Sequence, residues 1–150
     1  MHKYEKEMVL KEICSRIPYE QWVQYEDKDY LVTGYGHGRV SLLPSVFSSI
    51  GGPCPLIDEV KLYLRPISSM TKEEWGEFEK KFDVPLGAGE SATSFKVYNY
   101  VVIDFGYHYD MMLSDMADML SWLYLHHFDI NNLIGKGLAL EASTDMYATK

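Results

Sequence analysis

The feature that most constrains the fold is segment 111–127, which has helical spacing and is apolar around almost its whole circumference. One apolar face is formed by Leu113, Met116, Ala117, Leu120, Leu123, Tyr124 and His127. Four further apolar side chains lie elsewhere around the helix, namely Met112, Met119, Trp122 and Leu125. A narrow polar stripe remains, made of Ser114, Asp115, Asp118 and Ser121. Such a helix is either enclosed within its own fold or covered by another subunit. The second apolar group is therefore a candidate interface with a protein partner or a second copy of the chain.

Length and composition predict one globular domain over residues 1–150. A chain of 150 residues, of which 47% are hydrophobic, is long enough to bury a sizeable core. No apolar run approaches the roughly 20 residues of a membrane span, and the charged N-terminal stretch lacks the apolar core of a signal peptide. Cys14 and Cys54 are too isolated for a disulfide scaffold, so we expect reduced thiols and a cytoplasmic location.

The charge of the chain disfavours two classes of partner. Its formal value is −8, from 22 acidic and 14 basic residues, and the basic residues are scattered. Nucleic-acid binders neutralise phosphates with clustered Lys and Arg, so a nucleic acid is not an expected partner. An anionic membrane is disfavoured for the same reason, whereas a basic protein is electrostatically suited.

Hydrophobic periodicity in the first third of the chain indicates a helix followed by strands. Residues 5–16 carry an apolar stripe at helical spacing, which Pro18 ends. The aromatic and β-branched runs 21–26 and 30–35 are typical of a hairpin, and a glycine-rich strand or bulge is expected over 34–39.

The middle of the chain predicts a loop and two further strands. Residues 44–55 are rich in Ser, Gly and Pro and form the loop, which is the one place where a domain boundary could fall. Residues 60–65 alternate as a half-buried strand does. Residues 95–105 are apolar on both faces, which predicts a central strand.

The clearest local signal is the start of a helix after Thr71. Thr71 and Glu74 form a capping box, and Met70 with Trp75 forms a hydrophobic staple around it. Near the C-terminus, a similar pattern places Asp129 as the cap of a short helix over 130–136.

That second staple pairs Phe128 with Leu133, and residues 138–140 then run extended. Together these elements predict an α+β fold: a small, mostly antiparallel sheet with helices packed against it, ending in the long helix and the short one.

One group of ionisable residues is a candidate for catalysis. Asp104, His108 and Asp110 surround the end of the strand over 95–105, where a His beside two carboxylates can act as a general base. The simpler interpretation is a strand-to-helix connection in which Asp110 caps the next helix.

Metal and cofactor sites are not expected. His126 and His127 are adjacent, and neighbouring residues on a helix point about 100° apart, whereas zinc-binding helices place His at i and i+4. His127 fits a hydrogen-bonded core histidine better. The glycines of segment 34–39 do not have the spacing of a phosphate-binding loop.

Segments 61–71, 122–129 and 137–142, together with 10–19, resemble a group of small uncharacterised proteins encoded by phages and mobile elements of gut Bacteroidales. The resemblance implies an intracellular protein encoded by a mobile element. It implies no reaction, ligand or catalytic residue.

The sequence therefore favours a non-enzymatic accessory protein of a phage or mobile element, acting through protein–protein contacts. The alternative is a small hydrolase-like enzyme that uses His108 with Asp104 or Asp110.

Overall fold

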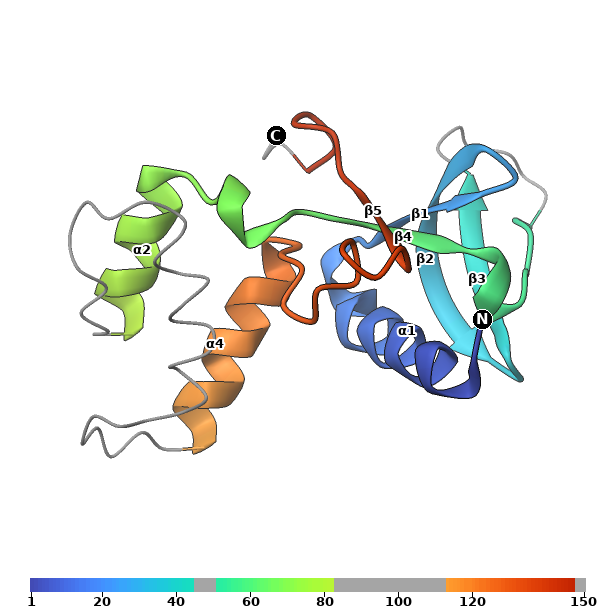
Figure 1. Cartoon of the computed structure of the whole chain (residues 1–150), viewed down its shortest axis with the longest axis horizontal. Helices are drawn as coiled ribbons and strands as arrows, with labels where there is room; N and C mark the ends of the chain where they lie inside the picture. The colour runs from blue at the N-terminus through green and yellow to red at the C-terminus, as the bar shows by residue number, and fades with distance from the viewer. Residues whose placement is uncertain (45–50, 83–112, 148–150) are drawn as a thin grey trace.

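The computed structural model describes residues 1–44, 51–82 and 113–147, and within them the fold is α+β (Figure 1). Three α-helices are present in these ranges: α1 (Lys3–Arg16), α2 (Lys72–Phe82) and α4 (Leu113–Leu125). The strands are β1 (Trp22–Tyr25), β2 (Lys28–Gly36), β3 (Arg39–Pro44), β4 (Lys61–Leu64) and β5 (Ala139–Glu141). Short 3-10 turns are η1 (Ile17–Tyr19), η2 (Ile57–Glu59) and η3 (Ile67–Ser69).

Two tight turns set the first half of the sheet. Glu26 and Asp27 between β1 and β2 have φ of 47° and 57°, and His37 and Gly38 between β2 and β3 have φ of 52° and 78°. Positive φ at both central residues is the turn geometry whose twist matches that of a hairpin. The predicted hairpin is confirmed. The segment predicted as a glycine-rich strand or bulge over 34–39 is strand at 34–36 and at Arg39 with a turn between them, and a register shift precedes it at Val32/Gly34.

The five strands lie in the order β3-β2-β1-β4-β5. Three of the four pairings are antiparallel, while β5 joins β4 in parallel, so the sheet is mixed. The predicted strand over 60–65 and the extended segment after Gly137 are β4 and β5. The outer edge of β3 is covered by its own chain, because Val40 and Leu42 donate their N–H groups to the carbonyls of Pro55 and Pro53.

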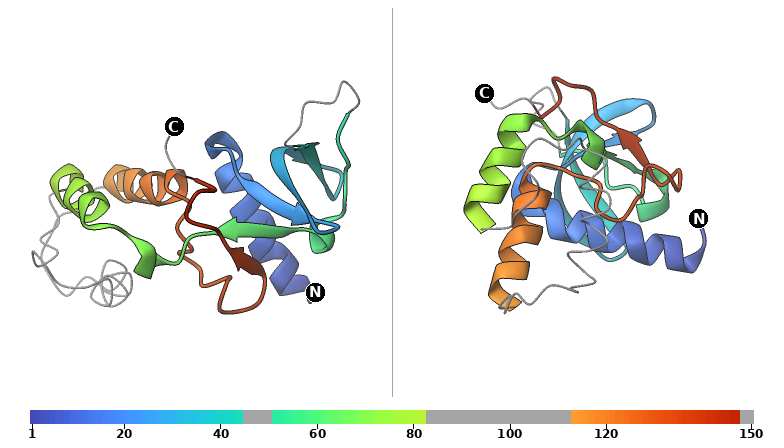
Figure 2. Two further views of the ribbon diagram at one scale, coloured as in Figure 1. Left: turned by 90° about the horizontal axis from the view of Figure 1, so that it is seen from above. Right: turned by 60° about the vertical axis from the view of Figure 1, so that its left-hand side comes forward.

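Among the described residues, the buried apolar side chains form two clusters. The first joins α1 to the sheet and includes Val9, Ile13, Val23, Leu62, Leu64 and Leu133. The second joins α2 to α4 and includes Ile67, Met70, Phe78, Met119, Trp122, Leu123 and Phe128. Figures 1 and 2 show α1 lying on the sheet and the α2–α4 pair at the opposite end of the molecule. The prediction that helices pack against the sheet is thus confirmed for α1, whereas α2 and α4 bury their apolar faces against each other.

The capping box of α2 is confirmed. Glu74 N–H donates to Thr71 Oγ1 at 3.2 Å, and Thr71 N–H donates to a carboxylate oxygen of Glu74 at 2.8 Å. Of the predicted staple pair, Met70 is buried in the second cluster and Trp75 is partly buried against that cluster.

The predicted short helix over 130–136 is wrong, because the chain there makes consecutive turns. Asp129 does accept backbone N–H groups, but from Leu133 and Ile134 at 2.8 Å each. A helix cap would accept from the second or third helical residue, 131 or 132. Asn132 has a φ of 54°, which breaks any right-handed helical run at that point.

The long helix predicted over 111–127 ends two residues earlier than expected. α4 ends at Leu125, and the chain leaves it through His127, whose φ is 60°. Residues 111–112 and the predicted strand over 95–105 lie outside the described residues. No helix within the described ranges has the length and apolar character needed to cross a membrane.

Candidate functional site

The candidate catalytic group lies outside the described residues. His108, Asp104 and Asp110 all fall within 83–112. Their juxtaposition therefore stays a prediction from sequence.

The structure places the candidate interface residues of α4 in different environments. Met119 and Trp122 are buried in the second cluster, whereas Leu125 is 51% exposed. Met112 lies outside the described residues. The ring of Trp122 contacts that of Phe78 edge-on at 5.1 Å, so its partner is α2 of the same chain. Two of the four side chains thus do not form a free surface.

The buried side of the helix draws on both predicted apolar groups. Met119 and Trp122 of the candidate interface are buried beside Leu123, whereas Ala117 and Leu120, which share the predicted apolar face with Leu123, are exposed. An α-helix that is apolar on two sides has no pattern that selects which side is buried. The aromatic ring of Phe78 makes that selection here, because it pairs with Trp122.

The outward face of α4 is apolar with one carboxylate. Leu120 and Leu125 are 43% and 51% exposed, and Ala117, Asp118 and Ser121 are exposed beside them. No Lys or Arg occurs anywhere in α4. We refer to Ala117, Asp118, Leu120, Ser121 and Leu125 as the outer face of α4.

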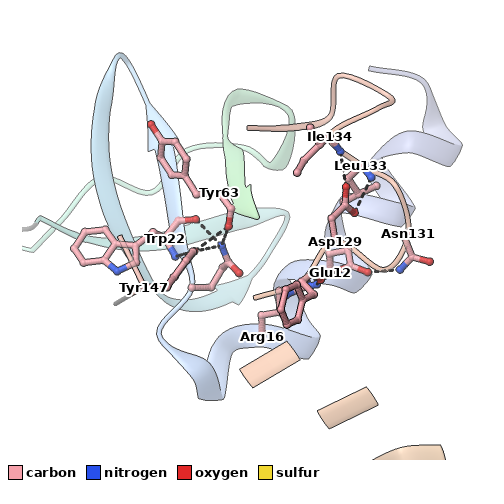
Figure 3. Close-up of polar contacts among 11 residues, drawn as sticks. Glu12, Arg16, Trp22, Tyr63, Asp129, Asn131, Leu133, Ile134 and Tyr147 are labelled. Atoms are coloured by element: carbon pink, nitrogen blue, oxygen red, sulfur yellow. Dashed lines mark hydrogen bonds and ion pairs between the residues drawn. The ribbon is translucent and has the colours of Figure 1, made fainter. Parts of the chain in front are cut away.

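A buried ion pair lies where the two clusters meet. Arg16 is fully buried at the end of α1, and its Nε and Nη2 each contact Glu12 Oε2 at 2.8 Å (Figure 3). Nη2 also donates to the backbone carbonyl of Phe128 at 2.6 Å, and Asn131 donates to the other oxygen of Glu12. The guanidinium lies over the ring of Tyr124, 4.7 Å from its centroid. This pair joins α1 of the first cluster to Phe128 of the second.

A second arginine supports the same junction from the sheet side. Arg65 exchanges backbone hydrogen bonds with His127 and Asp129, at 2.8 and 2.7 Å. Its guanidinium binds Glu74 through both oxygens, at 2.7 and 2.9 Å, and lies over the ring of Phe128. Burial acts to raise the pKa of Glu74, but the hydrogen bonds from Arg65 and from the Thr71 N–H, together with nearby positive charge, outweigh burial and lower it.

The adjacent histidines point to different partners. His126 stacks on Trp122 at 3.8 Å, and His127 stacks on Tyr147 at 3.5 Å with an interplanar angle of 11°. They therefore do not share a metal ion, and no group of three or more metal-ligating side chains occurs in 1–44, 51–82 and 113–147. Burial lowers the pKa of His127 to about 3, with Arg16 and Arg65 adding to the effect. Its imidazole is neutral at pH 7 and is a poor general base.

Tyr147 forms a polar contact that the sequence did not reveal. Its hydroxyl accepts from Trp22 N–H at 3.2 Å and from Gln21 Nε2 at 2.9 Å, and it donates to the Tyr63 carbonyl at 2.9 Å (Figure 3). Burial raises its pKa, which keeps the hydroxyl protonated. Segment 143–147 has no periodicity that would have marked this tyrosine as buried.

Comparison with protein-family models, with curated proteins and with solved structures found no match. The site is therefore defined by its own geometry: an outer helical face with exposed leucines, and a buried polar junction behind it.

Proposed function

We propose that this protein is a non-enzymatic accessory protein of a phage or mobile element, which binds a basic protein through the outer face of α4. The observation that carries the proposal is the exposure of Leu120 and Leu125 on a helix whose opposite side is already buried. An apolar face left in water on a packed helix marks an interaction surface.

The charge of the chain supports a basic partner over a second copy. With a formal charge of −8, two copies repel each other, whereas a basic protein is attracted. The outer face itself carries the carboxylate of Asp118 and no positive charge. Apolar contact at the centre with an acidic rim is a common arrangement at protein interfaces.

The polar groups of the junction support a binding role over catalysis. Arg16 Nε and Nη2 bind Glu12 within the chain, and Arg65 is committed to Glu74, whereas Arg16 Nη1 is buried with no hydrogen-bond partner among the described residues. His127 is neutral and covered by Tyr147. The hydrolase alternative depends on His108, Asp104 and Asp110, which the structure does not describe.

The experiment compares the wild type with the Leu120→Ser/Leu125→Ser double variant in cross-linked capture from the native host. The captured protein is then purified, and its affinity is measured by calorimetry at two salt concentrations. We expect a basic partner whose affinity drops at least about tenfold in the double variant and weakens with salt. Leu56→Ser is the matched control, because Leu56 is 42% exposed on the segment between β3 and η2 and should leave binding unchanged.

Two outcomes would contradict the proposal. One is equal loss of binding in Leu56→Ser and in the double variant, which would show a general effect of surface polarity. The other is a homodimer in sedimentation that the double variant disperses, which would assign the outer face to self-association.

A further inference from the structure

Tyr147 fills a socket that is built by separate parts of the chain. Gln21 and Trp22 come from the start of β1, Tyr63 from β4, and His127 from the turn after α4. These four residues are called the phenol socket below. The imidazole of His127 forms one flat wall, 3.5 Å from the Tyr147 ring.

The polar groups of the socket match one phenolic hydroxyl. Two donors, Trp22 N–H and Gln21 Nε2, and one acceptor, the Tyr63 carbonyl, converge on the Tyr147 oxygen. A hydroxyl has one donor and two acceptor positions, so it satisfies all three groups at once. Strands β1 and β4 pair at Val23↔Leu62, and the next position along is Trp22 opposite Tyr63. The hydroxyl thus bridges the two strands at the end of their ladder.

Contacts that do not involve Tyr147 hold the socket in shape. Gln21 is fully buried, and its two N–H groups are shared among the Tyr147 hydroxyl and the carbonyls of Trp22 and Tyr63, the carbonyls lying 2.6 and 2.9 Å from Nε2. The backbone of His127 donates to Tyr124 and accepts from Arg65, at 3.0 and 2.8 Å. A socket held in this way is preorganised for a ring, whichever molecule supplies the ring.

Two buried polar atoms of the socket residues form no hydrogen bond with Tyr147. Gln21 Oε1 and His127 Nδ1 are buried and have no hydrogen-bond partner among the described residues. A buried polar atom without a partner carries a desolvation cost. The Tyr147 hydroxyl does not remove that cost, because its hydrogen bonds go to other atoms.

The segment that connects β5 to Tyr147 is exposed to solvent at residues 143–145. Ala142 N–H donates to the Leu64 carbonyl at 2.8 Å, which continues the pairing of β5 with β4. Ser143, Thr144 and Asp145 beyond it are exposed. Tyr147 is therefore anchored at the end of a short exposed connection, so withdrawing it disturbs little else.

We propose that the phenol socket is a binding site for an external phenolic ring, either a small para-substituted phenol or a tyrosine side chain, and that Tyr147 is its internal competitor. This inference does not rest on the proposed function. Tyr147 and an external phenol compete for the socket. The apparent affinity of the external phenol is therefore lower than its affinity for the empty socket, in proportion to the fraction of molecules from whose socket Tyr147 has withdrawn.

The test is a titration of the full chain with p-cresol, in the wild type and in the variants Tyr147→Phe and Tyr147→Ala. We expect affinity to rise in that order, since Phe keeps the ring without the hydroxyl and Ala removes the competitor. The difference between wild type and Tyr147→Ala should be at least about tenfold. Toluene, which lacks the hydroxyl, should bind Tyr147→Ala at least about tenfold more weakly than p-cresol does. N-acetyl-tyrosinamide, titrated in parallel, shows whether a tyrosine side chain is accepted as well as a free phenol.

Hydrogen exchange on the wild type is the second measurement and does not depend on the folding of Tyr147→Ala. Saturating p-cresol should speed exchange of the 143–147 amides and leave that of α2 unchanged. Equal affinity of p-cresol for wild type and Tyr147→Phe, with unchanged exchange of the tail, would overturn the proposal. So would equal affinity of toluene and p-cresol for Tyr147→Ala, because the socket would then be an apolar cavity without selectivity for phenols.

Discussion

At the scale of single residues, the buried polar side chains Glu12, Arg16, Gln21 and His127 hold together segments that are distant in the sequence. Arg16 reaches the carbonyl of Phe128, and Gln21 reaches that of Tyr63. His127 differs from the other three, because its burial is matched by ring stacking and not by a hydrogen bond to Nδ1. It is therefore the side chain whose ionisation is most costly to the fold.

The first prediction concerns pH. Burial holds the pKa of His127 at about 3 in the folded chain, against 6.5 when unfolded. Between these values the unfolded chain binds the proton and the folded chain does not, so the free energy of unfolding falls as the pH drops below 6.5. From pH 7 to pH 4 we expect His127 to account for a loss of about 3 kcal/mol. Urea denaturation at pH 7, 5.5 and 4 measures this loss in the free energy of unfolding.

The matched variant for this prediction is His127→Asn, because Asn tolerates the positive φ and does not titrate. Its stability should depend less on pH than that of the wild type. Identical pH profiles for wild type and His127→Asn would contradict the prediction.

At the scale of elements, the helices show which predictions from local sequence patterns hold in the folded chain. α2 begins where its capping box places it, because the box uses hydrogen bonds within four residues and needs no tertiary partner. α4 forms as its spacing predicts, but its buried side was chosen by contact with Phe78 of α2. The turns after Asp129 replace a predicted helix, since the carboxylate binds N–H groups farther along the chain.

The second prediction concerns the cap of α2. Replacing Thr71 with Ala removes the acceptor for Glu74 N–H, so the free energy of unfolding should fall by about 1 kcal/mol. Thr71→Ser keeps the hydroxyl and should stay close to the wild type. Urea denaturation followed by tryptophan fluorescence reports on this helix, since Trp75 and Trp122 belong to the second cluster. A loss of equal size in both variants would show that the methyl group matters and the cap does not.

At the scale of the whole molecule, the two apolar clusters are joined by the buried contacts of Arg16 and Arg65. Arg16 extends from α1 to the backbone carbonyl of Phe128, and Arg65 continues β4 and lies over the Phe128 ring. Phe128 is fully buried and is contacted by both arginines. The sheet and the α2–α4 pair are thus linked through charged groups and backbone hydrogen bonds.

The third prediction tests this link. Arg16→Met leaves the Glu12 carboxylate buried without its cation, which should cost about 3–5 kcal/mol. The double variant Glu12→Gln/Arg16→Met removes the isolated charge and should lose less than the single variant does. Chemical denaturation of the wild type, the two single variants and the double variant gives the coupling energy between Glu12 and Arg16. If the double variant lost the sum of the two single losses, the pair would not act as a unit.

The sequence by itself determined the features that depend on near neighbours in the chain. These are the first helix ended by Pro18, the hairpin, the capping box at Thr71, the strand before Pro66 and the α+β class. Each follows from a spacing or a turn chemistry that acts over a few residues. The tertiary structure decided which side of α4 is buried, that Arg16 of the i,i+4 pair with Glu12 is buried against the Phe128 carbonyl, and that Tyr147 enters a socket made by Gln21, Trp22, Tyr63 and His127. Such contacts join residues up to 126 positions apart, and the energy of a buried polar group depends on the partner it meets in space, which no local pattern records.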